Sequence, residues 1–256
     1  MCPNPTVVRD LKTNMPGKKK NLIVLTLGLS GSSVLTGLIA RAGYWTGDET
    51  FKKEYDTYEN RDLIRLNSEL LEAAGYHKDY TSEFSWDAIR EVSSLHGKID
   101  LTGYRQFLTK CDAHGPWIWK DPRLYLTIRF WGKLLDLDHV KFVLLTRDPV
   151  QAWISQQLRR QICTYGYFRR YDNGLRDSLV SFLEENRTPY LVLGYEDLIV
   201  RPAQTLGELN RYIDTDLTVD DLKAIYTRPL YKKPRSYWDL ASAVAIYVKN
   251  YSERKR

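Results

Sequence analysis

The residues best suited to chemistry in this sequence lie in short turns after apolar runs, and the first of these turns is built from glycine and serine. It lies in the segment NLIVLTLGLSGSSVL, which contains Gly28, Ser30, Gly31, Ser32 and Ser33. Backbone N–H groups at the start of a helix bind phosphate with help from the helix dipole, and small residues let the oxygens approach closely. The turn therefore indicates an anion site, although a Gly/Ser turn without a ligand has the same composition. Because it contains no Gly-Lys pair, the Walker pattern is absent, which argues against an ordinary ATP or GTP hydrolase.

A second turn combines an arginine with a serine farther along the chain. In LLTRDPVQAWIS, Arg147 follows an apolar run, and Pro149 suits the first position of a helix. Ser155 would then lie up to two helical turns along, so that both side chains could reach one anion. A guanidinium offers bidentate donors to phosphate, and the hydroxyl adds another donor. The alternative is a surface pair between Arg147 and Asp148.

Two further turns repeat this arrangement. Lys120 follows the apolar stretch of GPWIW, and Tyr195 follows that of TPYLVLG. All four turns thus come at the carboxyl ends of predicted strands, the edge where open α/β sheets bind ligands. Lys120 is expected at that edge, with a pair to Asp121 as the alternative. Glu196 and Asp197 are expected to cap a helix or to place negative charge at its start.

The elements that must position these turns alternate between strands and helices. Apolar runs predict strands at 21–27 and 117–119 and within HVKFVLLT and TPYLVLG. Helices are predicted at 32–42, from 62 to the turn at Gly75, at 86–95, after Pro122, from Pro149, at 203–212 and at 219–226. This alternation predicts an α/β protein with a mostly parallel central sheet flanked by helices. We expect a single domain at 21–256 after a flexible leader at 1–20.

The composition is that of a globular protein and excludes intrinsic disorder. Of 256 residues, 43% are hydrophobic and 27% are charged, and the net charge is +6. From 228 to 256 there are eight basic residues and two acidic ones, which suggests an anionic ligand or an acidic surface nearby. The last residues, Arg254-Lys255-Arg256, are interpreted as a solvated basic tail. Charge alone would fit a nucleic-acid binder, but no zinc-finger, RNA-recognition or helix-turn-helix signature accompanies it.

The cysteines and the hydropathy pattern bear on the compartment. The spacing of Cys2, Cys111 and Cys163 matches neither a disulfide framework nor a zinc site, so a reducing cytoplasm is expected. A basic cluster at 18–20 precedes an apolar run, as in a signal peptide, but glycines and serines break that run. No apolar stretch is long enough to predict a transmembrane segment.

Taken together, the motifs resemble the sulfotransferase family, whose members transfer a sulfuryl group from 3′-phosphoadenosine-5′-phosphosulfate (PAPS). The resemblance is carried by GLSGSSVL, RDPVQAWIS and YEDLIVRPAQTL, each after a predicted strand. WKDPRL and GYWTGDETFKKEYDTYENRDLIRLNSELL are more similar to the bacterial branch, which acts on carbohydrates, lipids or small metabolites. The resemblance to the family covers about residues 21–213 and implies a P-loop NTPase-like sulfotransferase fold.

The resemblance also implies roles for the turns. The turn at 28–33 would hold the 5′-phosphosulfate end of the donor, and Arg147 with Ser155 would hold its 3′-phosphate. Tyr195 is similar to the family's tyrosine near the adenine, with a core aromatic as the alternative. The late segment RPLYKKPRSYW would bring Lys233 and Arg235 over the 3′-phosphate, although a solvated loop is an equal alternative. No metal is required, and the product would be 3′-phosphoadenosine-5′-phosphate (PAP).

One position departs from the family's pattern. Leu29 stands where the family usually has a lysine or arginine, and a missing donor to the developing charge costs about 3 kcal/mol of transition-state stabilisation. By resemblance, Lys120 takes the place of a family lysine that stabilises the transferring sulfonate, and it is our candidate to compensate. Arg123 is expected to be structural, bridging to an acidic neighbour.

A base must accept the proton of the acceptor. Glu59, in YDTYENRDL, matches the acidic position that the bacterial branch places near the acceptor, and Asp56 is held in reserve. The alternative for Glu59 is an exposed residue at a helix start. The four histidines are expected to be structural or solvated.

These inferences predict sulfuryl transfer to a hydroxyl or amine of a carbohydrate, lipid or small-metabolite acceptor. The acceptor pocket would lie between 45–59 and the region after Ser155, with aromatics of the first segment lining it or merely packing. Two alternatives remain: a non-catalytic or weakly active nucleotide-binding homologue, favoured by Leu29, and a small-molecule kinase with a degenerate P-loop.

Overall fold

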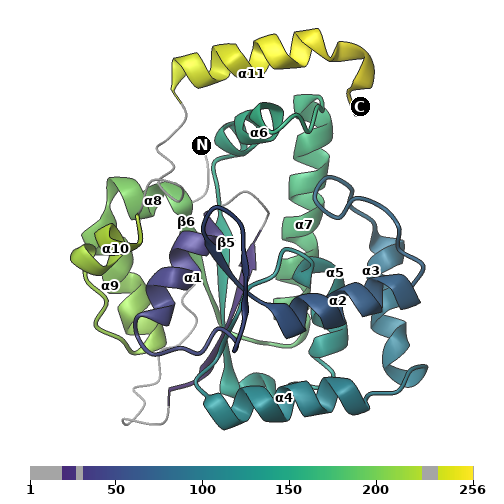
Figure 1. Cartoon of the computed structure of the whole chain (residues 1–256), viewed down its shortest axis with the longest axis vertical. Coiled ribbons are helices and arrows are strands. Elements are labelled where there is room, and N and C mark those ends of the chain that lie inside the picture. Colours follow the sequence, from purple (N-terminus) through teal and green to yellow (C-terminus); the bar gives the residue numbers. More distant parts are fainter. Residues whose placement is uncertain (1–18, 27–30, 227–235, 256) are drawn as a thin grey trace.

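The protein is an α/β structure with a parallel sheet at its centre, seen in a computed structural model that describes residues 19–26, 31–226 and 236–255 (Figure 1). The sheet has the strand order β4-β1-β5-β6, and every neighbouring pair is parallel. Its strands are β1 (Asn21–Thr26), β4 (Ile118–Trp119), β5 (Val140–Thr146) and β6 (Tyr190–Gly194). The predicted fold class and the four predicted strands are confirmed. β4 is one residue shorter than predicted, because Trp117 pairs instead with Trp45 in an isolated parallel bridge.

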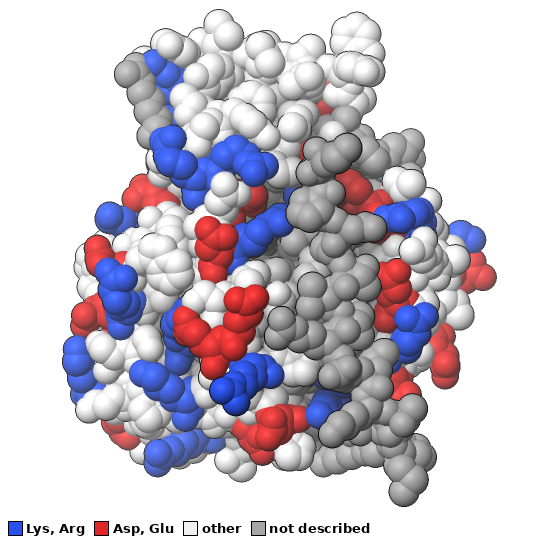
Figure 2. Space-filling model, turned by 180° about the vertical axis from the view of Figure 1, so that it is seen from behind, with Lys and Arg blue, Asp and Glu red and all other residues white. Residues whose placement is uncertain are grey.

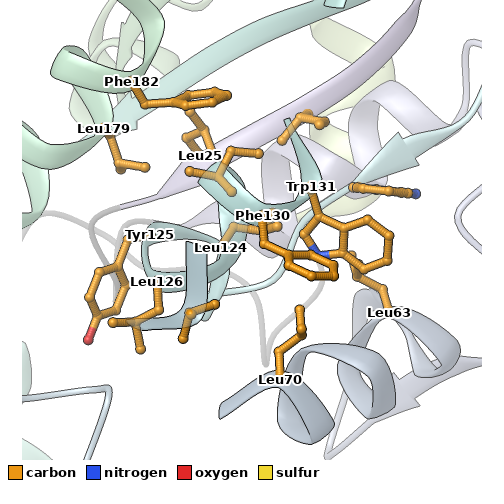
Figure 3. Packing of buried hydrophobic residues seen from close by; sticks show 14 of the residues in the cluster. Leu25, Leu63, Leu70, Leu124, Tyr125, Leu126, Phe130, Trp131, Leu179 and Phe182 are labelled. Carbon is orange, nitrogen blue, oxygen red and sulfur yellow. The ribbon is translucent and has the colours of Figure 1, made fainter. Parts of the chain in front are cut away.

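The central strand is buried on both faces, which explains its continuous apolar sequence. Alternate residues of β1 enter different cores, with Ile23 and Leu25 on one side and Leu22 and Val24 on the other. The first side is covered by α2 (Arg61–Ala73), α3 (Trp86–Ser94), α4 (Thr102–His114), α5 (Leu124–Trp131) and α7 (Tyr165–Glu185). Figure 3 shows side chains from β1, α2, α5 and α7 meeting in this cluster. The second side is covered by α1 (Ser32–Ala40), α8 (Tyr195–Val200), α9 (Pro202–Ile213) and α10 (Val219–Ile225).

A small antiparallel hairpin, β2 (Thr50–Lys52) and β3 (Asp56–Asn60), lies outside the main sheet. The hairpin runs directly into α2, because the side chain of Asn60 accepts hydrogen bonds from the N–H groups of Asp62 and Leu63. β3 packs on α1, where Tyr58 lies against Gly37. This connection carries the predicted base, Glu59, toward the first turn of α1. The hairpin was not predicted, because its short strands are mostly polar.

At one end of the molecule, α6 (Pro149–Leu158) lies beneath α11 (Tyr237–Lys249) (Figure 1). Asp148 caps α6 by accepting a hydrogen bond from the N–H of Gln151, and Pro149 occupies the first turn, as predicted. Short 3₁₀ turns complete the chain at η1 (Leu95–Gly97), η2 (Leu137–His139) and η3 (Tyr251–Glu253). None of the described helices is long and apolar enough to cross a membrane.

The predicted helices are present, with ends that differ by one or two residues. Helix α1 ends at Ala40 and α2 at Ala73, and each is followed by a glycine of positive φ, Gly43 and Gly75. Such glycines terminate helices because they adopt the left-handed conformation without strain. Helices α4, α7 and α11 were not predicted.

Candidate active site

A cavity of about 430 Å³ opens at the carboxyl edge of the sheet. Five of the predicted site residues line it: Gly31, Ser32, Ser33, Glu59 and Lys120. They come from the start of α1, from β3 and from the turn after β4. The hairpin and the residues after Ser155 also contribute to its lining, through Tyr55 and Gln156, and the prediction that an acceptor binds between these two regions stays a prediction.

A lysine–glutamate pair occupies the centre of this site. The Nζ of Lys120 is 2.5 Å from Oε1 of Glu59 and donates to the carbonyl oxygen of Thr57 at 3.0 Å and to Oγ of Ser33 at 3.3 Å. The side chain of Lys120 is 3% exposed and that of Glu59 is 13% exposed. Lys120 thus connects the hairpin with the first turn of α1. The alternatives considered for both residues are wrong, since Lys120 does not pair with Asp121 and Glu59 is not an exposed helix-start residue.

Asp121 is occupied by a different set of partners. Its carboxylate accepts from Nη1 and the N–H of Arg123, both at 2.9 Å, and from Nδ2 of Asn67 at 3.0 Å. Asn67 in turn accepts from Nε1 of the buried Trp131 at 2.8 Å. Burial alone would lower the pKa of Arg123, but the charge of Asp121, its hydrogen bond, and the nearby Tyr80 and Glu59 together outweigh burial, and the pKa is raised. This network fixes the turn that presents Lys120, and the expected structural role of Arg123 is confirmed.

The start of α1 is open to an anion in the part that the structure describes. Gly31 caps the helix with φ 76°, no side chain closes the cap, and the first turn holds no acidic residue. A Cβ on Gly31 would lie 2.1 Å from the ring of Tyr195, so only glycine fits here. Ser32 and Ser33 follow on the cavity wall. Gly28, Leu29 and Ser30 lie outside the described residues.

Arg147, Ser155 and Tyr195 are buried and are not among the described residues that line the cavity. The guanidinium of Arg147 lies 5.4 Å from the ring centre of Tyr195, and its Nε is 3.4 Å from Oε1 of Glu196. The alternative of a surface pair with Asp148 is therefore wrong, since Arg147 is buried and Asp148 instead donates its N–H to Glu196 at 3.1 Å. Glu196 lies in the first turn of α8, as expected, but its carboxylate connects that helix to the turn after β5.

The other predicted ligand residues are placed as follows. Oγ of Ser155 donates to the carbonyl oxygen of Gln151 at 2.9 Å, within α6. Asp56 accepts from Thr50 and from the N–H of Tyr58, so it stabilises the hairpin. Lys233 and Arg235 lie outside the described residues. The cofactor roles of Arg147, Ser155 and Tyr195 stay predictions.

Part of the cavity lining was not predicted from the sequence. It comprises Ile64, Tyr80, Pro122, Phe168, Tyr171 and Leu175, together with Arg123 and Arg159. The 3- and 4-residue spacing of Phe168, Tyr171 and Leu175 on α7 is the signal that could have revealed it. Tyr171 donates its hydroxyl to the carbonyl oxygen of Tyr80 at 3.0 Å, and burial raises its pKa well above the usual value. Its phenol therefore stays protonated and holds the Tyr80 loop in place.

The aromatic residues near the start of the predicted acceptor segment, and the histidines, mostly pack against or pair with other protein side chains. Tyr44 is buried in a core cluster, and Trp45 stacks on His114 with ring centres 4.7 Å apart. His139 is 2.8 Å from Asp136 at the surface. Over the described ranges, the structure contains no group of three or more His, Cys, Asp or Glu side chains that could hold a metal ion.

The solved structures that are similar to this chain include three sulfotransferases. They are a sulfotransferase domain from the Synechococcus PCC 7002 olefin synthase (TM-score 0.47, 17% identity, 91% of this chain and 97% of that chain), sulfotransferase STF9 from Mycobacterium avium (0.44, 14%, 93% and 77%) and sulfotransferase STF1 from Mycobacterium tuberculosis H37Rv (0.42, 14%, 91% and 77%). No family model and no curated protein matches the sequence. All three structures are of sulfotransferases, the family that the sequence motifs resemble. Because these TM-scores are below 0.5, we argue function from the site itself.

Proposed function

We propose that this protein transfers a sulfuryl group from PAPS to a hydroxyl or amine of a small-molecule, carbohydrate or lipid acceptor. One observation carries the proposal: a buried lysine and a carboxylate, Lys120 and Glu59, lie 2.5 Å apart in the same cavity as the start of α1. An anion-binding helix start, a cation and a base are the three groups that such a transfer needs.

The residues at the start of α1 fit the phosphosulfate end of the donor. Without an acidic residue in the first turn, the helix dipole and the main-chain N–H groups favour an anion there. Ser32 and Ser33 add hydroxyl donors on the cavity wall. PAPS supplies an activated sulfuryl group whose departure leaves negative charge on a phosphate oxygen.

Lys120 would stabilise that charge in place of the cation that Leu29 does not provide. Its Nζ already contacts the first turn of α1 through Ser33, so little movement is needed to reach an anion bound there. A donor held in place before the reaction stabilises developing charge at no cost of reorganisation. Because Lys120 reaches Glu59, Thr57 and Ser33 from one buried position, the protein itself provides this preorganisation.

Glu59 would accept the acceptor's proton. In the transfer, a bond forms between the acceptor oxygen or nitrogen and sulfur, the bond from sulfur to the phosphate oxygen breaks, and the proton passes to the Glu59 carboxylate. Glu59 lines the cavity, so an acceptor hydroxyl placed there lies between the carboxylate and the helix start.

The cavity wall indicates an acceptor with an apolar or ring-shaped body. Tyr55, Ile64 and Tyr80, which are partly exposed, offer flat and apolar surface, and the volume of about 430 Å³ is that of a small-molecule site. The guanidinium of Arg123 lies 4.5 Å from the ring centre of Tyr80, and because its charge is paired with Asp121, it holds this ring in place.

At the other end of the donor, we propose Arg147 and Ser155 as ligands of the 3′-phosphate and Tyr195 as a neighbour of the adenine. Arg147 pairs with Glu196, so binding of the phosphate would replace this carboxylate as the partner of the guanidinium. The rearrangement is small, because Glu196 is 26% exposed and can turn toward solvent.

Calorimetry with PAP, ADP and ATP plus Mg²⁺ tests the donor class, followed by incubation with sulfur-35-labelled PAPS and a panel of alcohols and amines. We expect PAP to bind more tightly than ADP, which lacks the 3′-phosphate, and label to appear in an acceptor. Preference for ATP with Mg²⁺ would instead indicate a kinase. Tight PAP binding without transfer to any acceptor would indicate the non-catalytic homologue.

A further inference from the structure

Helix α11 presents an apolar face to solvent at one end of the molecule. Tyr237 is 90% exposed, Trp238 is 83% exposed and Val248 is 63% exposed, and Val244 and Tyr251 are exposed as well. The helix, YWDLASAVAIYVK, carries charge only at Asp239 and Lys249. Figure 2 shows this end of the molecule as mostly uncharged. An apolar ridge of this kind on a protein surface marks an interaction site.

The opposite face of α11 is held firmly against the rest of the protein. Ala243 is fully buried, and the ring of Tyr247 lies 6.3 Å from that of Trp153 on α6. Beyond the helix, Lys255 donates its N–H to the carbonyl oxygen of Ile162, and its Nζ lies 2.9 Å from Oε1 of Glu83. The interpretation of 254–256 as a solvated tail is therefore wrong for Lys255. These contacts fix which face of α11 remains open.

Positive charge borders this apolar face. The segment 159–170, which we call the basic segment, contains four arginines and no acidic residue: Arg159, Arg160, Arg169 and Arg170. It contacts the residues that follow α11 and η3, because Thr164 donates its N–H to the carbonyl oxygen of Lys255 at 2.9 Å. Trp153 joins the segment to α11 itself, since its ring lies 6.0 Å from that of Tyr165 and 6.3 Å from that of Tyr247. Figure 2 shows Lys and Arg side chains beneath the uncharged end. The basic segment is thus a neighbour of the apolar helix.

We propose that α11 and the basic segment dock this protein on an anionic lipid surface, independently of the proposed function. A helix that lies in the plane of a membrane buries apolar and aromatic side chains, while arginines and lysines bind the head groups. Tyr237 and Trp238, at the start of α11, are the residue types that favour the membrane–water boundary. A second copy of the chain is a poorer occupant, because two basic segments would face each other and a single short helix contributes a small part of the roughly 800 Å² per partner of a stable interface.

Co-sedimentation of the whole chain with vesicles tests this proposal. We expect binding to phosphatidylcholine vesicles that contain about 30% phosphatidylserine, weak binding to phosphatidylcholine alone, and a decrease with added salt. Val248→Glu should weaken binding at least about tenfold, because a charge then lies in the apolar face. Val200→Glu is the matched control: Val200 is a 69% exposed valine on helix α8, outside this surface, and its substitution should change binding little.

Tryptophan fluorescence gives a second readout. On binding, emission should shift to shorter wavelength as Trp238 leaves water, and Trp238→Phe should remove the shift while keeping most of the binding. The proposal fails if wild type and Val248→Glu bind anionic vesicles equally, or if neither binds. It also fails if sedimentation velocity shows a dimer that Val248→Glu dissociates, since the face would then bind a second copy.

Discussion

Lys120 and Arg147 are both buried cations at the carboxyl ends of strands in the same sheet, β4 and β5, yet their surroundings differ. Lys120 lines the cavity and pairs with Glu59, which comes from a separate hairpin. Arg147 is covered, lies against Tyr195, and pairs with Glu196 of the next strand's turn. A residue's position at the end of a strand thus predicts that it lies at the carboxyl edge of the sheet. Whether its side chain reaches a cavity depends on the residues that pack around it.

The difference separates two expected roles. At Lys120, the ion pair belongs to the reacting centre that we propose, so its loss should affect turnover most. At Arg147, the ion pair joins the turns after β5 and β6, so its loss should affect folding as well as ligand binding.

The largest effect is expected from Lys120→Ala. Removing a preorganised donor from the developing charge should lower kcat by about 10²- to 10³-fold. PAP affinity should change far less, since the main-chain groups at the start of α1 remain. Steady-state kinetics and calorimetry would measure both. Lys98→Ala, which removes an exposed lysine paired with Glu91, is the control. Full activity of Lys120→Ala would show that another group compensates for Leu29.

Gly31→Ala tests the contact through which Tyr195 connects the two regions. A methyl group would both adopt an unfavourable positive φ and overlap the Tyr195 ring, and we expect the free energy of unfolding to fall by about 3 kcal/mol. Gly43→Ala is the control: the φ of Gly43 is also positive, but no heavy atom lies within 4 Å of the position that the new Cβ would take. This substitution should therefore lower the free energy of unfolding only by the cost of the positive φ, about 1 kcal/mol. If urea denaturation shows the same loss of unfolding free energy in both variants, the overlap with the Tyr195 ring does not contribute.

A smaller loss is expected from Arg147→Ala. Breaking a fully buried pair costs about 3–5 kcal/mol, but Glu196 is partly exposed, so we expect about 2 kcal/mol of unfolding free energy. The preference for PAP over ADP should also shrink, because the 3′-phosphate loses its guanidinium. Glu196→Gln leaves Arg147 in place and should retain the preference. If Arg147→Ala keeps it too, the residue is purely structural.

The smallest effect concerns a buried carboxylate that, unlike Glu59 and Glu196, forms no salt bridge within the part of the chain that the structure describes. Asp172 lies on α7 with Oδ2 unsatisfied, and burial raises its pKa despite the nearby Arg176 and Arg169. As pH rises above the unfolded value of about 3.9, the unfolded chain ionises first, so the folded state loses stability until the pH passes the folded pKa. Asp172→Asn lacks this loss.

The stability of Asp172→Asn relative to wild type should therefore be lowest at about pH 3.5, increase as the pH rises through the folded pKa of Asp172, and then level off. Thermal unfolding followed by circular dichroism across this range would show it. A constant difference at every pH would mean that packing, and not ionisation, distinguishes the two proteins.

The sequence predicted those features that local patterns determine. The apolar run of β1, the proline at the start of α6 and the glycines after α1 and α2 act within a few residues, and their elements are present as predicted. Lys120 and Glu59 were both selected from the sequence, and the structure brings them into contact.

Partners far apart in the chain were not predictable in the same way. From the sequence, the alternative ion-pair partners considered for Lys120 and Arg147 were their neighbours in the chain, Asp121 and Asp148. In the structure, Lys120 pairs with Glu59, which is 61 residues away, and Arg147 pairs with Glu196, which is 49 residues away. Likewise, the segment that contains α11 was analysed from the sequence only for its excess of basic residues. In the structure, its apolar residues form a helix that packs on α6.

The most direct test of the account is the transfer of labelled sulfate from PAPS by wild type and by Glu59→Gln, with PAP affinity measured on both. Glutamine keeps the size of the side chain but cannot accept the proton, so transfer should fall by about 10²-fold or more while the Kd for PAP stays nearly unchanged. Transfer by Glu59→Gln at the wild-type rate would contradict the assignment of this cavity as the reacting centre.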